Sequence, residues 1–340
     1  MPYFPENLDD WRKISFLIER SEKIFISTHV NPDGDAIGSE MALAEFLSKM
    51  GKVIRIINHS PTPDAFFYLD PQEKIEFFQD DLLYTIGPKK SDMVFFLDMG
   101  KYERAGRSAE FLAYTSAAKV IIDHHPPEPV EADVVVINTN AASTGSLVYD
   151  LICHIDSSLI NKEIALAMMT AIVTDTGYFR YSNTTATTHL IASSLYQYGV
   201  RAINVRKQIE KGYPVCRQIL LSMTLNNLKT NSSDEVAYSL ITKSMFEEAG
   251  AKREHTDGII DQLRIIKGIK IVFLVIQEGE NKYKVSFRSG DGISVNVIAS
   301  KLGGGGHPRA AGANMTGSLE HVTNRVLDVV EDYLKSNRHD

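Results

Sequence analysis

The chain has 340 residues, of which 44% are hydrophobic and 23% charged, a composition typical of a globular protein with a core of normal size. This length favours two domains over one. The 36 basic and 43 acidic residues give a formal net charge of −7, which argues against a protein that coats long duplex nucleic acid, because such proteins carry a basic stripe.

The cysteines and the amino terminus indicate the cellular compartment. Cys153 and Cys216 are far apart in the sequence and form no CxxC pattern, so a disulfide framework is not expected and a reducing compartment is. The first residues, MPYFPENLDDWRKISFLIER, include early acidic residues and lack the apolar core of a signal peptide. Apolar runs are much shorter than the roughly 20 residues that span a bilayer. The sequence therefore predicts a cytoplasmic protein without a membrane partner.

Strands and helices alternate in the first half of the chain. Residues 22–29 (EKIFISTH) are expected to form a strand, and residues 35–51 (DAIGSEMALAEFLSKMG) a helix with one apolar face. Four more strands are expected in KVIRIINH (52–59), MVFFLDMG (93–100), KVIIDHH (119–125) and DVVVINT (133–139). These strands show little in–out alternation, as in sheets covered on both faces. The pattern predicts an α/β fold with a doubly wound, mostly parallel sheet.

Three helical stretches follow, and then the character of the sequence changes. Helices are expected from about Thr144, in 161–177 up to a loop around Asp175, and in 186–210. From about Asp234 we expect a strand (236–246), a helix (256–266), a hairpin (269–289) turning at Glu278–Asn281, a helix (292–302), a loop (303–313) and a closing helix near Leu319–Leu334. The predicted domains are residues 1–190, a helical linker at 191–230, and a smaller α+β domain at 231–340.

The expected element ends share acidic or histidine side chains. They are His29, Asp33 and Asp35 in HVNPDGDAIGS, Asp98 in FFLDMG, Asp123, His124 and His125 in IIDHH, and Asp175 in AIVTDTG. The carboxyl ends of parallel strands lie at one edge of a sheet, where ligands bind. Residues spread over about 150 positions can therefore converge on one site.

These side chains suit divalent metal ions. Carboxylate oxygens and imidazole nitrogens favour Mn²⁺ or Mg²⁺. The absence of cysteine from these motifs argues against a structural zinc site. Asp33 and Asp35, two residues apart, can serve two different ions, and Asp98 is the candidate bridge because it stands alone at its strand end. Taken singly, each aspartate is more often a turn former or a helix cap. Their occurrence at four successive element ends predicts a metal site.

A second group of candidates lies in KLGGGGHPRAAGA. Its glycines allow close approach of the backbone to an anion, and His307, Arg309 and the more distant Arg288 add hydrogen-bond donors. The alternative is a flexible glycine-rich loop without a ligand. Similarly, ASTGS at 142–146 can present a helix N-terminus to an anion, or can simply cap a helix.

Five of these motifs together resemble a known family. HVNPDGDAIGS, FFLDMG, IIDHHPP and IVTDTG resemble the four motifs of the DHH phosphoesterases, and GGGGHPRAAG resembles the signature of the DHH-associated C-terminal domain. The resemblance runs from about His29 to Gly312 and implies a catalytic domain and a substrate-binding domain across a cleft. The compact layout is most similar to bacterial oligoribonucleases that degrade short RNA and dephosphorylate 3′-phosphoadenosine 5′-phosphate.

The resemblance also implies roles for individual residues. One Mn²⁺ is expected on His29, Asp33 and Asp98, and a second on Asp35, Asp98, His124 and Asp175, with Mg²⁺ or Co²⁺ as alternatives. Asp123 would orient the imidazoles and His125 would face the scissile phosphate, so that Asp98, Asp123 and His125 form the catalytic group. The expected substrate-binding residues are Arg288, Gly304, Gly305, Gly306, His307 and, with less weight, Arg309.

Other functions are compatible with parts of this pattern. The first four motifs do not separate a nuclease from a family II inorganic pyrophosphatase, an exopolyphosphatase or a phosphodiesterase of cyclic or linear dinucleotides. A non-catalytic nucleotide- or RNA-binding protein would be expected to lack at least one ligand, and none is missing here. The expected partners are short RNA oligonucleotides and phosphorylated nucleotides, and a homodimer is a further expectation.

Overall fold

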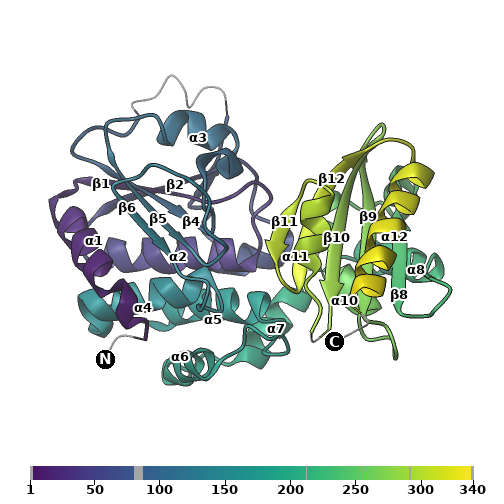
Figure 1. Ribbon diagram of the computed structural model, residues 1–340. Coiled ribbons are helices and arrows are strands. Elements are labelled where there is room, and N and C mark those ends of the chain that lie inside the picture. Colours follow the sequence, from purple (N-terminus) through teal and green to yellow (C-terminus); the bar gives the residue numbers. More distant parts are fainter. Residues whose placement is uncertain (1–2, 80–86, 212, 257, 291, 338–340) are drawn as a thin grey trace. The chain divides into compact units, whose positions relative to one another are not determined.

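The computed structural model describes residues 3–79, 87–211, 213–256, 258–290 and 292–337. The chain divides into two compact units, Met1–Gly212 and Tyr213–Asp340 (Figure 1). Each unit contains its own six-stranded sheet. None of the described helices is long and apolar enough to cross a membrane.

The sheet of the first unit is parallel throughout its described pairings, which confirms the predicted α/β class. Its strands are β1 (Lys23–Ser27), β2 (Val53–Asn58), β3 (Ile75–Phe77), β4 (Met93–Leu97), β5 (Ala118–Asp123) and β6 (Val134–Ile137). They lie in the order β3-β2-β1-β4-β5-β6, so the strand order reverses between β1 and β4. In open parallel sheets, ligands bind at this switch point. The short edge strand β3 was not predicted.

Helices cover both faces of this sheet (Figure 1). The helices of the first unit are α1 (Leu8–Arg20), α2 (Gly34–Lys49), α3 (Arg107–Leu112), α4 (Thr144–Asp156), α5 (Lys162–Asp175), α6 (Ala186–Tyr196) and α7 (Ala202–Lys211), of which α6 and α7 pack against α5. The apolar side chains of α3 pack on one face, against Phe25, Phe96 and Ile121. On the other face, α2 is packed so tightly against α5 that a Cβ at Gly38 would lie 2.5 Å from the carbonyl oxygen of Ala167.

The second unit has a mixed sheet with helices on both faces. Its strands are β7 (Lys229–Thr230), β8 (Val236–Ile241), β9 (Ile271–Gly279), β10 (Lys282–Ser289), β11 (Gly305–His307) and β12 (Ala310–Thr316), in the order β11-β12-β10-β9-β8-β7. Its helices are α8 (Val215–Asn226), α9 (Lys243–Ala249), α10 (Ile259–Leu263), α11 (Val295–Lys301) and α12 (Leu319–Ser336). One core forms under α11 and α12 and another under α8, α9 and α10.

The structure corrects two expectations in this unit. The glycine-rich stretch 303–313 is not a loop, because it contains β11 and most of β12, which pair antiparallel. The strand expected over 236–246 ends at Ile241, and Thr242 then caps helix α9 by accepting a hydrogen bond from the Met245 amide. The hairpin of β9 and β10 is confirmed. The boundary between the two units follows Gly212, so α6 and α7 belong to the first unit and α8 to the second. The domain limits expected from the sequence stay a prediction.

Candidate metal centre

The switch point between β1 and β4 is where the predicted metal ligands gather. His29 follows β1 by two residues, and Asp98 follows β4 directly. The His29 Nε2 atom lies 3.3 Å from Asp98 Oδ2. Asp33 joins them, because ligand atoms of His29, Asp33 and Asp98 lie within 4.8 Å of one another. Asp98 is held in a left-handed backbone conformation (φ 59°), an uncommon state for a non-glycine residue that is concentrated at functional sites.

The turn after β1 fixes its own aspartates through the start of a helix. Asp33 is the N-cap of α2, and its Oδ1 accepts hydrogen bonds from the amides of Asp35 (3.0 Å) and Ala36 (3.1 Å). Capping satisfies amide groups that the first helical turn leaves without an intrahelical partner. Asp35 then lies in the first turn of α2 and is buried. Asp33 can therefore cap the helix and bind a metal ion at the same time.

His124 lies among three carboxylates that come from three different elements. Its Nε2 is 3.5 Å from Asp35 Oδ2, 3.7 Å from Asp98 Oδ1 and 3.5 Å from Asp175 Oδ2. Asp35 comes from α2, Asp98 from the end of β4, and Asp175 is the last residue of α5. The structure thus brings together all six predicted ligands, His29 and Asp33 included, around Asp98 and His124.

The hydrogen-bond partners of His29 and His124 show which ring nitrogen carries the hydrogen, and therefore which nitrogen faces the carboxylates. Nδ1 of His29 is 3.0 Å from the carbonyl oxygen of Val30, and Nδ1 of His124 is 3.4 Å from that of Ala141. A carbonyl oxygen only accepts hydrogen bonds, so Nδ1 carries hydrogen and the neutral ring presents the Nε2 lone pair. A lone pair that faces a carboxylate oxygen requires a cation, either a proton or a metal ion, between the two atoms.

The distances fit a shared divalent cation. Two ligand atoms that are each about 2.1 Å from one ion, at about 90–110° to one another, lie about 3.0–3.4 Å apart. The separation from His29 to Asp98 (3.3 Å) falls in this range, and that from His124 to Asp35 (3.5 Å) is close to it. Mixed carboxylate and imidazole ligands suit Mn²⁺. The donor set therefore fits divalent metal ions, as the sequence predicts.

The N-terminus of α4 holds two of these carboxylates. Asp35 accepts hydrogen bonds from the amides of Thr144 (2.7 Å) and Gly145 (2.9 Å), and the Thr144 hydroxyl donates to Asp98 Oδ1 (3.0 Å). The positive end of a helix stabilises a negative charge placed there. The sequence ASTGS had two readings, anion binding and capping. Capping is confirmed, because Ser143 caps α4, and the amides of this helix N-terminus bind the chain's own Asp35, while binding of an anionic ligand there stays a prediction.

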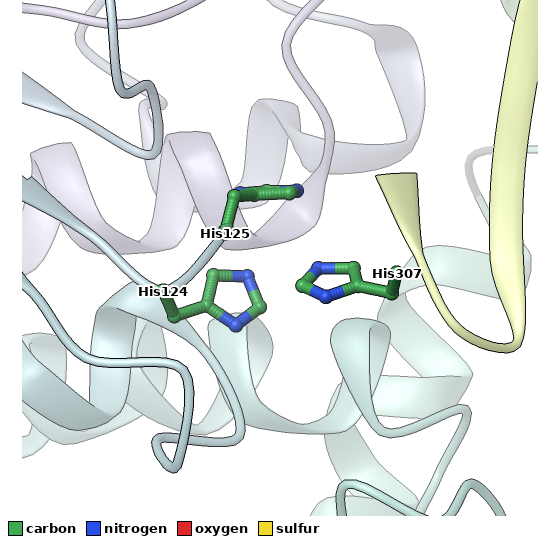
Figure 2. A group of neighbouring side chains, drawn as sticks. All are labelled: His124, His125 and His307. Carbon is green, nitrogen blue, oxygen red and sulfur yellow. The ribbon is translucent and has the colours of Figure 1, made fainter. Parts of the chain in front are cut away.

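Asp123 and His125 form a separate pair beside the ligands. Asp123, the buried last residue of β5, accepts hydrogen bonds through Oδ1 from the amides of His124 (2.8 Å) and His125 (3.1 Å) and from His125 Nδ1 (2.8 Å). The rings of His124 and His125 meet edge to face, with centroids 4.6 Å apart, so their outer nitrogens point in different directions (Figure 2). His125 Nδ1 is also 3.5 Å from Asp98 Oδ1. Asp123 thus contacts both the backbone and the ring of His125, and the orienting role that the resemblance implies for it stays a prediction.

The crowding of charges shifts the pKa values of the cluster. Burial, and then the charges of Asp98 and Asp175, raise the pKa of Asp35 well above its usual range. Burial also raises the pKa of Asp175 to about 6. Burial would raise the pKa of Asp98 as well, but the hydrogen bond from His29 and the charges of the histidines lower it far below its usual range. Burial lowers the pKa of His125, but the hydrogen bond to Asp123 outweighs it and raises the pKa to about 9.

The candidate substrate residues lie together in the second unit. Arg288 on β10 and His307 on β11 are both register partners of Ala310 on β12, so the two side chains share one face of the sheet and flank a small residue. Neighbouring strands are about 4.8 Å apart, which separates the two backbones by about 10 Å. Arg309 lies in the turn between β11 and β12, where its carbonyl oxygen accepts a hydrogen bond from the Ser289 amide (3.2 Å).

The glycines of this hairpin have a structural reason of their own. A Cβ at Gly304 would lie 2.0 Å from the carbonyl oxygen of Gly312, and one at Gly306 would lie 2.7 Å from that of Ala310. Gly306 also has a positive φ of 133°. At Gly305, by contrast, a Cβ would meet nothing within 4 Å. Two of the three glycines are thus required by strand packing, whatever they bind.

One residue that supports the centre had no signal in the sequence. Asn183, between α5 and α6, donates through Nδ2 to Asp175 Oδ2 (3.3 Å), to the Asp175 carbonyl oxygen (3.1 Å) and to the Ala142 carbonyl oxygen (3.0 Å). Asn183 therefore ties the last ligand to the segment that precedes α4. A polar side chain in a polar stretch such as YSNTT is indistinguishable from an ordinary loop residue until the fold is known.

Comparison with known proteins shows which family the chain belongs to. Residues 23–172 match the N-terminal domain of the DHH family, and residues 234–336 match the DHHA1 domain. A relative from Thermus thermophilus, named bifunctional oligoribonuclease and PAP phosphatase NrnA, is 33% identical over 95% of each chain. The chain belongs to the DHH family. The first of its two matched domains contains every predicted metal ligand except Asp175, which lies three residues beyond it.

Solved structures of DHH relatives share the fold. An exopolyphosphatase-related protein from Bacteroides fragilis has a TM-score of 0.83 at 27% identity, covering 97% of this chain and 96% of that one. RecJ from Thermus thermophilus, solved in complex with Mn²⁺, has a TM-score of 0.56 at 15% identity, covering 96% of this chain and 55% of that one. At 15% identity the RecJ likeness concerns the fold alone.

Proposed function

We propose that this DHH protein is a metal-dependent hydrolase that cleaves short oligoribonucleotides to mononucleotides and converts 3′-phosphoadenosine 5′-phosphate to AMP. The observation that carries the proposal is the convergence of His29, Asp98 and His124 with three further carboxylates at the switch point of the sheet. The substrates are supported by the name of the relative from Thermus thermophilus, which covers nearly the whole chain.

The proposed ligand sets divide the cluster between two Mn²⁺ ions. His29, Asp33 and Asp98 would hold one ion, and Asp35, Asp98, His124 and Asp175 the other, so that Asp98 belongs to both sets. Support comes from Asp98, whose Oδ2 faces His29 while its Oδ1 faces His124. When bound, divalent ions polarise the phosphoryl group and make a water molecule a stronger nucleophile.

His125 is the proposed catalytic residue beside the metal ligands. Its Nδ1 donates to Asp123, and this hydrogen bond outweighs burial and raises the pKa of the ring to about 9 in the metal-free protein. A protonated imidazole donates from both nitrogens, so Nε2 is available to donate to an oxygen of the substrate phosphate. Charge developing on that oxygen during hydrolysis would be stabilised by this donor. Asp123 acts through His125 by fixing its ring and its charge.

The second unit is proposed to bind the rest of the substrate. Arg288 and His307 share one face of its sheet, and a guanidinium with an imidazole suits a phosphate and its neighbouring sugar. Gly305 leaves space above the backbone, which favours close approach of a ligand there. Arg309 and the neighbouring Gly304 and Gly306 complete the proposed group. The domain limits 1–190, 191–230 and 231–340 remain part of this proposal.

A second candidate function is hydrolysis of pyrophosphate or polyphosphate. It is favoured by the likeness to the exopolyphosphatase-related protein from Bacteroides fragilis. The same metal centre would serve either substrate, because both reactions transfer a phosphoryl group to water.

The two cysteines are free, which is compatible with the proposed location in the cytoplasm.

Turnover of a small set of substrates tests the proposal. Purified protein with Mn²⁺ is incubated with a diribonucleotide, 3′-phosphoadenosine 5′-phosphate, pyrophosphate and polyphosphate, and the products are separated by chromatography. We expect mononucleotides and AMP, and loss of both activities on chelation of Mn²⁺ or in His124→Ala. Cleavage of pyrophosphate or polyphosphate alone would establish the second candidate and refute the first.

A further inference from the structure

Arg104 lies in the connection that leads away from the metal ligand Asp98. The 3-10 turn η4 (Tyr102–Ala105) follows β4 and precedes α3. The carbonyl oxygen of Arg104 accepts a hydrogen bond from the amide of Val30 at 2.7 Å. Val30 directly follows His29, so the backbone of Arg104 is tied to the segment that carries this ligand.

The backbone next to Arg104 is fixed on its far side as well. Gly106 adopts a left-handed conformation (φ 58°), and a Cβ there would lie 2.7 Å from Val30 Cγ2 and 2.8 Å from His59 Cγ. The next amide, of Arg107, donates to His59 Nδ1 at 3.0 Å. The turn therefore has little freedom to move away from His29, and the Arg104 side chain starts from a defined position.

The guanidinium of Arg104 has no partner within the described residues, with which it forms neither an ion pair nor a hydrogen bond. Other arginines of the first unit do pair, for example Arg55 with Glu76 and Arg206 with Glu210. Arg104 is only partly exposed, so water does not fully solvate its charge. An arginine whose backbone is tied to the residue after a metal ligand, and whose guanidinium pairs with none of the described carboxylates, is suited to an anion that arrives from solution.

Arg104 makes a small contribution to the pKa of two imidazoles of the cluster. Burial lowers the pKa of His29 and of His125, hydrogen bonds to Asp98 and Asp123 and the nearby carboxylates outweigh it, and the charge of Arg104 lowers the pKa of each slightly. These two imidazoles contact different oxygens of Asp98, Oδ2 and Oδ1 respectively. The position of Arg104 itself is given by its backbone hydrogen bond to Val30, the residue that follows the ligand His29.

We propose that Arg104 is a further catalytic residue, which binds a non-bridging oxygen of the phosphate group that undergoes hydrolysis. This inference rests on the proposed function and adds a second phosphate-binding residue in the first unit, beside His125, that the sequence analysis did not predict. A guanidinium can donate two parallel hydrogen bonds to a phosphate and remains charged at any relevant pH. It would complement His125, which donates from the ring held by Asp123.

Phosphate binding tests this role without reference to turnover. Inorganic phosphate is titrated calorimetrically into Mn²⁺-loaded wild type, Arg104→Gln, Arg104→Lys and the control Arg107→Gln, which alters an exposed arginine three residues along. We expect phosphate to bind about 10–100-fold more weakly to Arg104→Gln, as for loss of a hydrogen bond to a charged group. Arg104→Lys should recover part of the loss, because it keeps the charge without the fork.

Two further measurements separate this role from a structural one. Mn²⁺ affinity of Arg104→Gln should equal that of wild type, and kcat for a diribonucleotide should fall at least about 10-fold relative to Arg107→Gln. Phosphate affinity equal to that of Arg107→Gln would overturn the inference, and so would loss of Mn²⁺ binding, which would make Arg104 a support for His29. If wild type cleaves no phosphoester, the proposed function fails, whereas the phosphate titration still decides the role of Arg104.

Discussion

Glu40 is a buried carboxyl group whose ionisation should control how stability depends on pH. It lies in α2 with no exposed surface, and its Oε2 accepts a hydrogen bond from Asn58 Nδ2 at 2.8 Å. Its Oε1 has no hydrogen-bond partner in the described part of the chain. Burial raises the pKa of Glu40 from 4.5 to about 8, so the native protein keeps this group protonated at neutral pH.

The sign and size of the effect follow from proton binding. Between about pH 4.5 and 8 the native state binds a proton at Glu40 that the unfolded chain has lost, so stability falls as pH rises through this window. Above about pH 8 the native group ionises too and this contribution levels off. Each unit of pKa difference corresponds to about 1.4 kcal/mol, which gives a loss on the order of 5 kcal/mol across the window.

The substitution Glu40→Gln should remove this dependence. The amide oxygen can still accept from Asn58, but the side chain cannot ionise. Denaturant unfolding of metal-free protein at about pH 5, 6, 7 and 8 measures the free energy of unfolding at each pH. We expect wild type to lose about 3–4 kcal/mol of stability relative to Glu40→Gln between about pH 5 and 8.

The matched control for this experiment is Glu45→Gln, five residues along the same helix. Glu45 is partly exposed, so its substitution should leave the slope of the wild-type curve in place. Because the amide introduced by Glu40→Gln also buries an extra polar group, the slope carries the test and the absolute offset does not. Parallel curves for wild type and Glu40→Gln would refute the reasoning.

Three other substitutions have defined outcomes. Asp123→Asn removes the carboxylate that accepts the hydrogen bond from His125 Nδ1. We expect kcat to fall about 10–100-fold in steady-state assays while the affinity for Mn²⁺ is kept. An unchanged kcat would contradict the role of Asp123 in positioning His125. Asn183→Ala releases Asp175, and calorimetry should show Mn²⁺ binding about 10-fold weaker, whereas equal affinity would make this contact irrelevant to the centre. Gly38→Ala places a methyl group 2.5 Å from the Ala167 carbonyl oxygen, so unfolding should cost about 1–3 kcal/mol less; a neutral effect would mean that α2 and α5 pack less closely.

The candidate metal centre was predictable because several of its residues follow regular elements. Apolar runs such as MVFFL mark buried strands in any α/β protein, and the residue after each run must lie at the carboxyl edge of the sheet. Asp98 and His124 could therefore be assigned to one edge before the strand order was known. The order itself, with β1 beside β4, depends on pairings that the local sequence does not contain.

The contacts that hold the ligands were less accessible to sequence analysis. Thr144 and Gly145 bind Asp35 across more than 100 residues, and such contacts leave no periodic signal. The glycine-rich stretch was expected to be a loop because glycine disfavours strands, yet tight packing of β11 on β12 requires glycine at 304 and 306. Here tertiary packing overrides local propensity.

The central claim is that the carboxylates and imidazoles around Asp98 hold divalent metal ions. Calorimetric titration of metal-free protein with Mn²⁺, with the bound metal counted by elemental analysis, tests it most directly. For wild type we expect two ions per chain, and for Asp98→Asn, which alters the one residue in both proposed sets, we expect loss of tight binding at both sites. A wild-type protein that takes up no Mn²⁺, or an Asp98→Asn variant that binds two ions as tightly as wild type, would contradict the account.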